Sequence, residues 1–129
     1  MKEFEIKDEV SFNMALAQIR SYLLGMNCPE VAIAKILTTT SELARNILKY
    51  ADHGKVCIEK KSKAFKEGIE VITSDRGPGI KDIDKALSDN YSSGGTLGMG
   101  LPGVKRMMDE FKIESNLGEG TVVKAILWL

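Results

Sequence analysis

The hydrophobic positions of this chain repeat with the period of a strand in some segments and with that of a helix in others. Phe4 and Ile6 alternate with charged residues, which predicts a short edge strand. After Asp8, a suitable N-cap, apolar residues recur at helical spacing as far as Gly25, which ends the first predicted helix. Pro29 then opens a second helix, because proline is favoured in a first turn.

The second predicted helix has an apolar arc and an opposite polar arc, so its two faces have different surroundings. The apolar arc predicts a surface that faces the core, and it consists of Ile33, Ile36, Leu37, Thr40, Leu43, Ala44, Ile47 and Leu48. The polar arc consists of Thr38, Glu42, Asn46 and Lys49. The turn Asp52-His53-Gly54 ends this helix.

The middle of the chain predicts a hairpin followed by two shorter helices. Residues 56–59 and 69–73 have strand character and are joined by a lysine-rich segment, 60–68. A short amphipathic helix is expected around residues 83–87, and another begins near Pro102. The core stripe of the latter helix is predicted to consist of Leu101, Val104, Met107, Met108 and Phe111.

The chain ends in a second hairpin, in which Ile113 and Ser115 precede a glycine-rich turn at 118–120 and residues 121–129 return. The full order is therefore β-α-α-β-β-α-α-β-β, with many hairpins and few long crossovers. This order predicts an α+β two-layer sandwich, in which a mixed, largely antiparallel sheet is covered on one face by helices.

The composition excludes several classes of protein. At 129 residues, with 43% hydrophobic and 28% charged residues, the chain is expected to form a single domain over residues 1–129. Its 18 basic and 18 acidic residues cancel, which gives no basic field for a nucleic acid or an anionic membrane. Cys28, Cys57 and the single His53 are too few for a zinc site, and both cysteines are expected to be small core residues. Because the N-terminus has no signal-peptide pattern and no apolar run reaches membrane-spanning length, a cytoplasmic location is expected.

The lysine-rich segment between the first two hairpin strands has two interpretations, a basic patch or a solvated hairpin loop. Its lysines are Lys60, Lys61, Lys63 and Lys66. Acidic residues flank them at Glu59, Glu67 and Glu70, so the loop interpretation is favoured.

The glycines are concentrated in one part of the chain. Of the 12 glycines, seven lie between residues 77 and 103, namely Gly77, Gly79, Gly94, Gly95, Gly98, Gly100 and Gly103. Because glycine lets the backbone approach a ligand closely, this concentration predicts a nucleotide site in which backbone N–H groups face phosphates. A flexible loop is the alternative, but it does not explain why the glycines end where an amphipathic helix begins. The chain contains neither a P-loop motif nor a Rossmann fingerprint.

Three side chains on the polar arc of the second helix, Glu42, Asn46 and Lys49, have the chemistry for phosphoryl transfer. Glu42 and Asn46 are four residues apart, so they lie one helical turn apart and point the same way. The amide oxygen of Asn46 suits Mg²⁺, and the carboxylate of Glu42 can take a proton from an attacking hydroxyl. Lys49 can reach a phosphate. The alternative interpretation is a solvated helix face, which is the rule on surface helices.

A further candidate is Asp75, which ends a predicted strand directly before two glycines. A carboxylate held there can accept a hydrogen bond from the exocyclic amine of adenine. The alternative is an Asx turn, which is common before such glycine turns.

Together, in this order and spacing, these motifs resemble those of the Bergerat-fold (GHKL) ATPases. Glu42-x-x-x-Asn46 resembles the N box, Asp75-x-Gly77-x-Gly79 the G1 box, and Gly95-x-x-Gly98-x-Gly100-Leu101 the G2 box of that group. Gly118-x-Gly120-Thr121 resembles its C-terminal element. Within the group the chain is similar to the bacterial switch protein kinases, especially the stressosome serine/threonine kinases (RsbT type), whose sister group is the anti-sigma-factor kinases. The segments TSELARN, SDRGPGI, GGTLGMGLPGVKRMMDEF and TVVKAILWL carry this likeness.

The resemblance implies ATP and Mg²⁺ as cofactors and a role for each motif residue. Asn46 would ligate Mg²⁺, Glu42 would act as the base toward a serine or threonine hydroxyl, and Asp75 would select adenine. Gly77 and Gly79 would give the base room, Thr121 would support Asp75, and Lys49 would be a further phosphate contact. Gly95 to Gly100 would form a short lid over the phosphates, and the residues around the nucleotide would be Gly95, Thr96, Leu97, Gly98, Met99, Gly100 and Leu101. Independently of the resemblance, a kinase that acts on folded proteins needs a short, open lid, and residues 88–97 are short enough to provide it.

The resemblance also implies partners. The substrates would be STAS-domain proteins of the stressosome scaffold, and the released kinase would bind and activate a PP2C-type phosphatase in a sigma-factor stress cascade. An anti-sigma-factor kinase, which sequesters a sigma factor and phosphorylates an anti-anti-sigma STAS protein, is the principal alternative. A binding module that mainly sequesters a sigma factor and a detached histidine-kinase ATP domain are the others.

Overall fold

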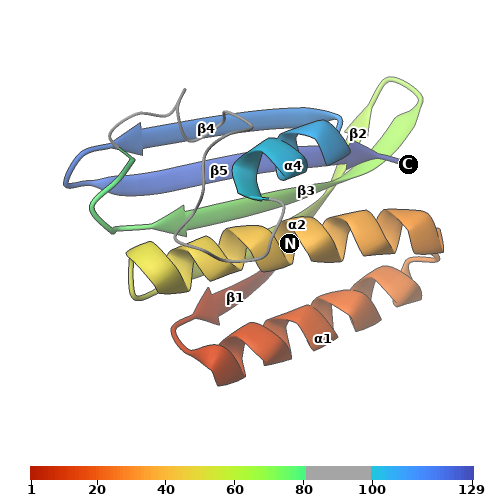
Figure 1. Cartoon of the computed structure of the whole chain (residues 1–129). Coiled ribbons are helices and arrows are strands. Elements are labelled where there is room, and N and C mark those ends of the chain that lie inside the picture. The colour runs from red at the N-terminus through yellow and green to blue at the C-terminus, as the bar shows by residue number, and fades with distance from the viewer. Residues whose placement is uncertain (81–99) are drawn as a thin grey trace.

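The computed structural model of the chain describes residues 1–80 and 100–129 (Figure 1). In chain order, its strands and helices are β1 (Lys2–Ile6), α1 (Glu9–Gly25), α2 (Glu30–Tyr50), β2 (Gly54–Lys63), β3 (Lys66–Asp75), α4 (Gly100–Met107), β4 (Glu110–Asn116) and β5 (Gly120–Trp128). The helix expected around residues 83–87 and the lid expected at 88–97 lie outside the described residues.

The strands form one five-stranded sheet in the order β1-β2-β3-β5-β4. Each described pairing is antiparallel, and the last strand of the chain, β5, lies between β3 and β4. The helices lie together on one side of this sheet (Figure 1). The expected α+β two-layer sandwich is confirmed. The sequence predicts a mixed, largely antiparallel sheet, and the described strands contain no parallel pair.

The core lies between the helices and one face of the sheet. Alternate residues of neighbouring strands are aligned across this face, so that Phe4 pairs with Val56, Val56 with Thr73, and Thr73 with Val123. A second row of aligned residues contains Ile58, Val71 and Ala125, each fully buried. Against these rows the helices pack Phe12, Ile19, Leu23, Ile33, Ile36, Leu43, Ile47 and Val104, all of which are buried.

Helix α2 is oriented as its two arcs predict. Of the apolar arc, Ile33, Ile36, Thr40, Leu43, Ala44 and Ile47 are buried, and Leu37 and Leu48 are half-buried. The buried hydroxyl of Thr40 donates to the carbonyl oxygen of Ile36 at 2.7 Å, which satisfies its hydrogen-bonding need inside the helix.

Helix α1 begins at the predicted N-cap, Asp8. The carboxylate of Asp8 accepts a hydrogen bond from the Ser11 N–H at 2.8 Å, and the Ser11 hydroxyl accepts one from the Asp8 N–H at 3.0 Å. This reciprocal pair is a capping box, and the Ser11 N–H holds the pKa of Asp8 below its usual value.

Two local predictions are wrong. The lysine-rich segment is mostly strand rather than loop, since β2 reaches Lys63 and β3 begins at Lys66. Their alternating charges form cross-strand pairs such as Lys60–Glu67 at 3.9 Å, and only Ala64 and Phe65 form the turn.

The second correction concerns Phe111, which belongs to β4 and not to the helix before it. Helix α4 ends at Met107, after which the Asp109 N–H donates to the carbonyl oxygen of Ile126 at 2.9 Å. This bond starts the pairing of β4 with β5, so Phe111 contributes to the core from the sheet.

The two cysteines differ from each other in position. Cys28 is buried, as expected, whereas Cys57 is half-buried on the face of the sheet that carries no helices. Burial raises the pKa of the Cys28 thiol, and burial together with the Glu3 carboxylate raises that of Cys57. Both thiols therefore stay protonated near neutral pH and lack the thiolate character of a nucleophile.

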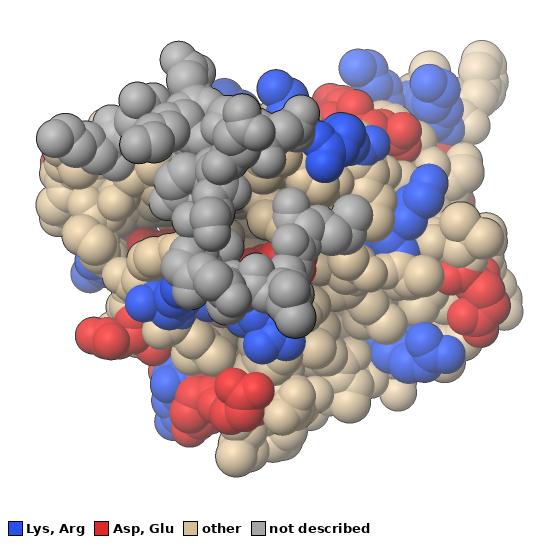
Figure 2. Space-filling model, viewed as in Figure 1, with Lys and Arg blue, Asp and Glu red and all other residues tan. Residues whose placement is uncertain are grey.

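The surface has mixed charge. Basic and acidic side chains are interspersed over the coloured residues of the face seen in Figure 2, in keeping with equal numbers of the two kinds. In the described part of the chain, the helices are too short or too polar to cross a membrane.

The burial of β3 can be tested with two valines. Val71 in β3 is fully buried, and Val31 in the first turn of α2 is 69% exposed. We expect Val71→Ala to lower the free energy of unfolding by about 2 to 3 kcal/mol, because it removes buried carbon atoms and leaves a cavity. Val31→Ala deletes the same atoms from the surface and should change it by less than about 0.5 kcal/mol. Urea denaturation of both variants measures this, and equal losses would contradict the described core.

Candidate functional site

The core face of the sheet becomes polar at one end. In the last aligned row Asp75 pairs with Gly54 on one side and with Thr121 on the other, and Thr121 pairs with Ser115. The next rows inward are apolar or buried, so this polar row, which consists of Asp75, Thr121 and Ser115, marks a change in the surface that the helices cover. Three polar side chains from β3, β5 and β4 are thereby brought together, although they are far apart in the sequence.

The carboxylate of Asp75 organises the turn that follows it. Its Oδ1 accepts a hydrogen bond from the Gly77 N–H at 2.9 Å, which is the Asx turn that the sequence offered as an alternative. This bond uses Oδ1 and does not involve Oδ2. The two interpretations of Asp75 are therefore compatible, because one oxygen shapes the turn and the other can accept from a ligand.

The two glycines after Asp75 are required by close packing. A Cβ on Gly77 would lie 2.6 Å from the Cβ of Ala51, at the end of α2. Gly79 has a φ of +80°, and a Cβ there would lie 2.5 Å from the carbonyl oxygen of Asn116. These contacts bring the turn against both α2 and the β4–β5 hairpin. The role of these glycines in giving a base room stays a prediction.

Ser115 ties the same turn to the C-terminal hairpin. Its hydroxyl accepts a hydrogen bond from the Ile80 N–H at 2.7 Å and lies 2.8 Å from the hydroxyl of Thr121. The Gly118 N–H adds a bond to the carbonyl oxygen of Pro78 at 2.9 Å. Sequence reasoning did not identify Ser115 as a site residue. The available signal was a hydroxyl at an inward position of a strand whose other inward residues, Phe111 and Ile113, are apolar.

The polar arc of α2 faces the start of α4. Glu42 and Asn46 are both half-buried, and Glu42 Oε2 accepts a hydrogen bond from the Gly100 N–H at 3.3 Å. This bond places a carboxylate at the first residue of α4, which a solvated helix face would not do. Lys49 is exposed, and its Nζ lies 5.4 Å from the ring centroid of Tyr50.

Helix α4 begins close to its expected position. Gly100 opens it with a φ of +65°, and Leu101 is 7% exposed. Five residues proposed for the phosphate cradle lie outside the described residues: Gly95, Thr96, Leu97, Gly98 and Met99.

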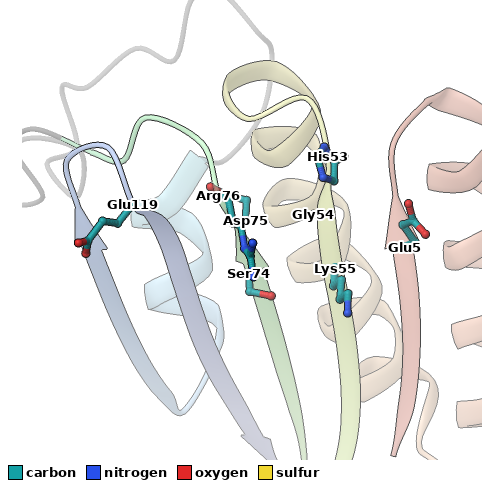
Figure 3. A pocket seen from close by; sticks show the side chains of 8 residues that line it. All are labelled: Glu5, His53, Gly54, Lys55, Ser74, Asp75, Arg76 and Glu119. Carbon is teal, nitrogen blue, oxygen red and sulfur yellow. The ribbon is translucent and has the colours of Figure 1, made fainter.

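A separate cleft of about 580 Å³ lies at the same end of the sheet. Its lining mixes acidic and basic groups, namely Glu5, His53, Gly54, Lys55, Ser74, Asp75, Arg76 and Glu119 (Figure 3). Glu5, Lys55 and Ser74 alternate with residues of the core face, so most of the cleft opens on the other side of the sheet from Glu42. It shares Asp75 with the polar row but does not contain the polar arc of α2.

The donor set limits the kind of metal that can bind. The described residues contain no group of three or more His, Cys, Asp or Glu side chains able to hold an ion. Glu42 and Asn46 offer one carboxylate and one amide, which suits an ion that takes few protein ligands.

Comparison with known proteins agrees with this architecture. Residues 7–127 match the model of the histidine kinase-like ATPase domain. The chain is 53% identical over 96 residues to the serine/threonine-protein kinase RsbT of Bacillus subtilis, which covers 74% of this chain and 72% of that protein. It is 37% identical over 99 residues to an anti-sigma F factor of a Thermoanaerobacter species, covering 71% and 67% of the two chains.

A solved structure supports the fold. The crystal structure of the RsbU and RsbW domains of a Mycobacterium tuberculosis protein aligns with a TM-score of 0.67 and 18% identity. The alignment covers 98% of this chain and 32% of that one, so it concerns one part of the larger molecule.

Two glycines with the same backbone conformation test the packing of the turn. Gly79 and Gly118 have φ values of +80° and +79°, but a Cβ on Gly118 would meet nothing within 4 Å. Both alanine variants carry the strain of a positive φ, and only Gly79→Ala adds a collision with Asn116. We expect Gly79→Ala to lower the melting temperature by about 5 °C or more beyond the shift of Gly118→Ala. Equal shifts in differential scanning calorimetry would show that backbone strain alone decides.

Proposed function

The chain belongs to the family of histidine kinase-like ATPase domains, and we propose that it acts as a switch kinase that phosphorylates a STAS-domain protein. As a serine/threonine-protein kinase, it would transfer the γ-phosphoryl group of ATP to a hydroxyl of a folded partner. The observation that carries this proposal is the hydrogen bond between Glu42 and Gly100, which holds a carboxylate at the start of α4.

The described residues fit ATP with Mg²⁺. Glu42 and Asn46 are half-buried and one turn apart, and the described residues lack the carboxylate cluster that would hold an ion alone. Mg²⁺ commonly keeps several waters and takes one or two protein ligands together with substrate phosphates. The amide oxygen of Asn46 is the proposed ligand, and the bound ion would neutralise phosphate charge during transfer.

Glu42 is the proposed base. The Gly100 N–H donates to Oε2 and so orients the carboxylate, which is assigned to accept the proton of a serine or threonine hydroxyl. The hydroxyl oxygen then forms a bond to the γ-phosphorus, while the bond from that phosphorus to the β–γ bridging oxygen breaks and ADP leaves. Such a transfer needs positioning and charge neutralisation more than covalent chemistry by the protein.

Asp75 is proposed to recognise the adenine. Oδ1 already accepts from Gly77, so Oδ2 is the oxygen assigned to the exocyclic amine of the base. Thr121, the register partner of Asp75 on β5, would support this contact. Residues 95–101 and Lys49 are proposed to surround the phosphates, in keeping with the position of Gly100 beside Glu42.

The partners are also part of the proposal. STAS-domain scaffold proteins would be substrates and a PP2C-type phosphatase a binding partner, in a cytoplasmic stressosome and sigma-factor cascade. The 53% identity to a kinase named RsbT supports this version. A second candidate is an anti-sigma kinase that sequesters a sigma factor, and the likeness to anti-sigma F factors, 37% over 99 residues, favours it.

The catalytic assignment can be tested by Glu42→Gln. The amide oxygen of glutamine can still accept from the Gly100 N–H, but it cannot take a proton at neutral pH. We expect phosphoryl transfer to a STAS protein to fall by about 100-fold or more, with ATP affinity changed by less than about threefold. Labelled ATP, Mg²⁺ and the purified proteins measure the transfer, and calorimetry measures ATP binding.

Glu30→Gln is the matched control, because Glu30 lies on the same helix and its side chain is 73% exposed. It should transfer at the rate of the unaltered chain. Loss of ATP binding in Glu42→Gln would contradict the role of base. ATP binding without transfer to any STAS protein, together with a stable sigma-factor complex, would select the second candidate.

A further inference from the structure

We propose that the exposed side of helix α1 is a dimer interface, on which two copies of this chain pack antiparallel about a twofold axis at Ala17. The residues concerned, which we call the outer stripe, are Val10, Met14, Ala17, Ser21 and Leu24. Such a dimer lies beyond the proposed kinase activity and does not depend on it.

Helix α1 is apolar on two opposite sides. Its core side buries four side chains, namely Phe12, Ala15, Ile19 and Leu23. Its other side exposes three large apolar side chains, since Val10 is 67%, Met14 55% and Leu24 46% exposed. A surface helix normally carries polar residues on that side, and a helix that is apolar all round is normally buried. The second apolar side of α1 therefore indicates a surface that another molecule covers.

The outer stripe has the spacing of a coiled-coil seam. Its residues follow one another at intervals of four, three, four and three, which is the alternation that keeps two helices in contact along one line. At about 1.5 Å per residue, the stripe from Val10 to Leu24 runs for about 21 Å, which is most of the length of α1. Single exposed apolar residues are common on protein surfaces, but a line of them at this spacing fits a second helix.

The sizes of the side chains favour an antiparallel pair. With Ala17 opposite Ala17 of the second copy, Val10 lies opposite Leu24, and Met14 lies opposite Ser21. A parallel pair would instead place Met14 on Met14 and Ser21 on Ser21, which gives one crowded layer and one layer with a void. Because Ala17 and Ser21 are small, the helix axes can approach to the short end of the usual range of about 8 to 10 Å. An interface in which the same patch meets itself closes at two copies, so it gives a dimer and not a filament.

The charges near the outer stripe do not oppose this contact. Of the flanking positions only one is charged, and these positions are Ser11, Asn13, Gln18, Arg20 and Gly25. Arg20 is paired within its own chain, since its Nη2 lies 3.8 Å from Glu30 Oε2. In the antiparallel pair the two copies of Arg20 are about 9 Å apart along the axis, which is close to the screening length at physiological salt. The 18 basic and 18 acidic residues cancel, so no net charge drives two copies apart.

The position of α1 leaves the candidate site uncovered in such a dimer. Helix α1 packs against α2 and β1, whereas α4 packs against α2, so α1 lies at the outer margin of the helical layer (Figure 1). Glu42 meets the start of α4, on the other side of α2. The two edges of the sheet are poorer surfaces for self-association, because β1 and β4 carry charged residues that oppose edge-to-edge pairing.

Sedimentation equilibrium of the full chain, from about 1 µM to about 1 mM, measures the association. A single pair of helices lies at the low end of interface sizes, so we expect a reversible dimer with a Kd of about 10 to 100 µM. We expect Met14→Glu to raise this Kd about tenfold or more, because each dimer would then bury two carboxylates that have no partner.

Leu117→Glu is the matched control. Leu117 is 65% exposed and lies in the turn between β4 and β5, at the edge of the sheet away from β1 and α1. The substitution introduces the same charge and should leave the Kd within about twofold of that of the unaltered chain. The melting temperatures of both variants show whether they are folded.

Cysteine cross-linking tests the orientation and supplies a second measurement if Met14→Glu does not fold. With oxidised glutathione as the oxidant, Ala17→Cys should form a disulfide-linked dimer, because the two side chains meet at the axis. Chains with Val10→Cys, mixed with chains that carry Leu24→Cys, should link to each other more than either links to itself. The unaltered chain, whose Cys28 is buried and whose Cys57 is half-buried, is the blank.

Three results would overturn the proposal. A chain that stays monomeric up to about 1 mM would leave the outer stripe to a helix of a different protein. A dimer that Met14→Glu does not weaken more than Leu117→Glu would use another surface. Cross-links of Val10→Cys and Leu24→Cys chains to themselves and not to each other would contradict the antiparallel arrangement. These measurements use no nucleotide, so a failure of the proposed kinase activity would not change them.

Discussion

The burial of one face of α2 is the constraint on which the arrangement of the site depends. Ile36, Leu43 and Ile47 are buried against the sheet, and this fixes the rotation of the helix about its axis. With the rotation fixed, the polar arc carries Glu42 to the start of α4. A helix is rigid over these few turns, so the position of the catalytic candidates is determined by hydrophobic packing on the other side of the same element.

The sheet positions the other candidate site residues, and it does so through strand register instead of helix rotation. Cross-strand register places Asp75 and Thr121 in one row, and register cannot shift by one residue without turning apolar side chains to the surface. The turn after Asp75 is then fixed twice, once by its own carboxylate and once by the β4–β5 hairpin. Hydrogen bonds specify the details, and apolar burial keeps the strands that carry them in place.

The sequence was most informative where one period dominates. The arcs of α2, the Asp8 cap and the strand before Asp75 could be predicted because helical and strand periods there have no competitor. Phe111 was misplaced because it fits both the helical spacing after Met107 and the strand alternation with Ile113, and only pairing with β5 decides. Ser115 could not be recognised as part of the site, since its partnership with Thr121 depends on register. The full lengths of β2 and β3 could not be predicted, because the charged residues that suggested a loop are paired across the two strands.

The central position of β5 has a consequence for how the protein acquires function. β5 follows β3 and β4 in the sequence but lies between them in the sheet, so the row that contains Asp75 is incomplete until β5 has inserted. Contacts of this range form late and slowly, because the intervening chain must first be ordered. A truncated chain that lacks β5 would leave β3 and β4 without the strand that joins them, and its polar row would lack Thr121. Any ligand that needs this row would therefore bind only molecules in which β5 has inserted.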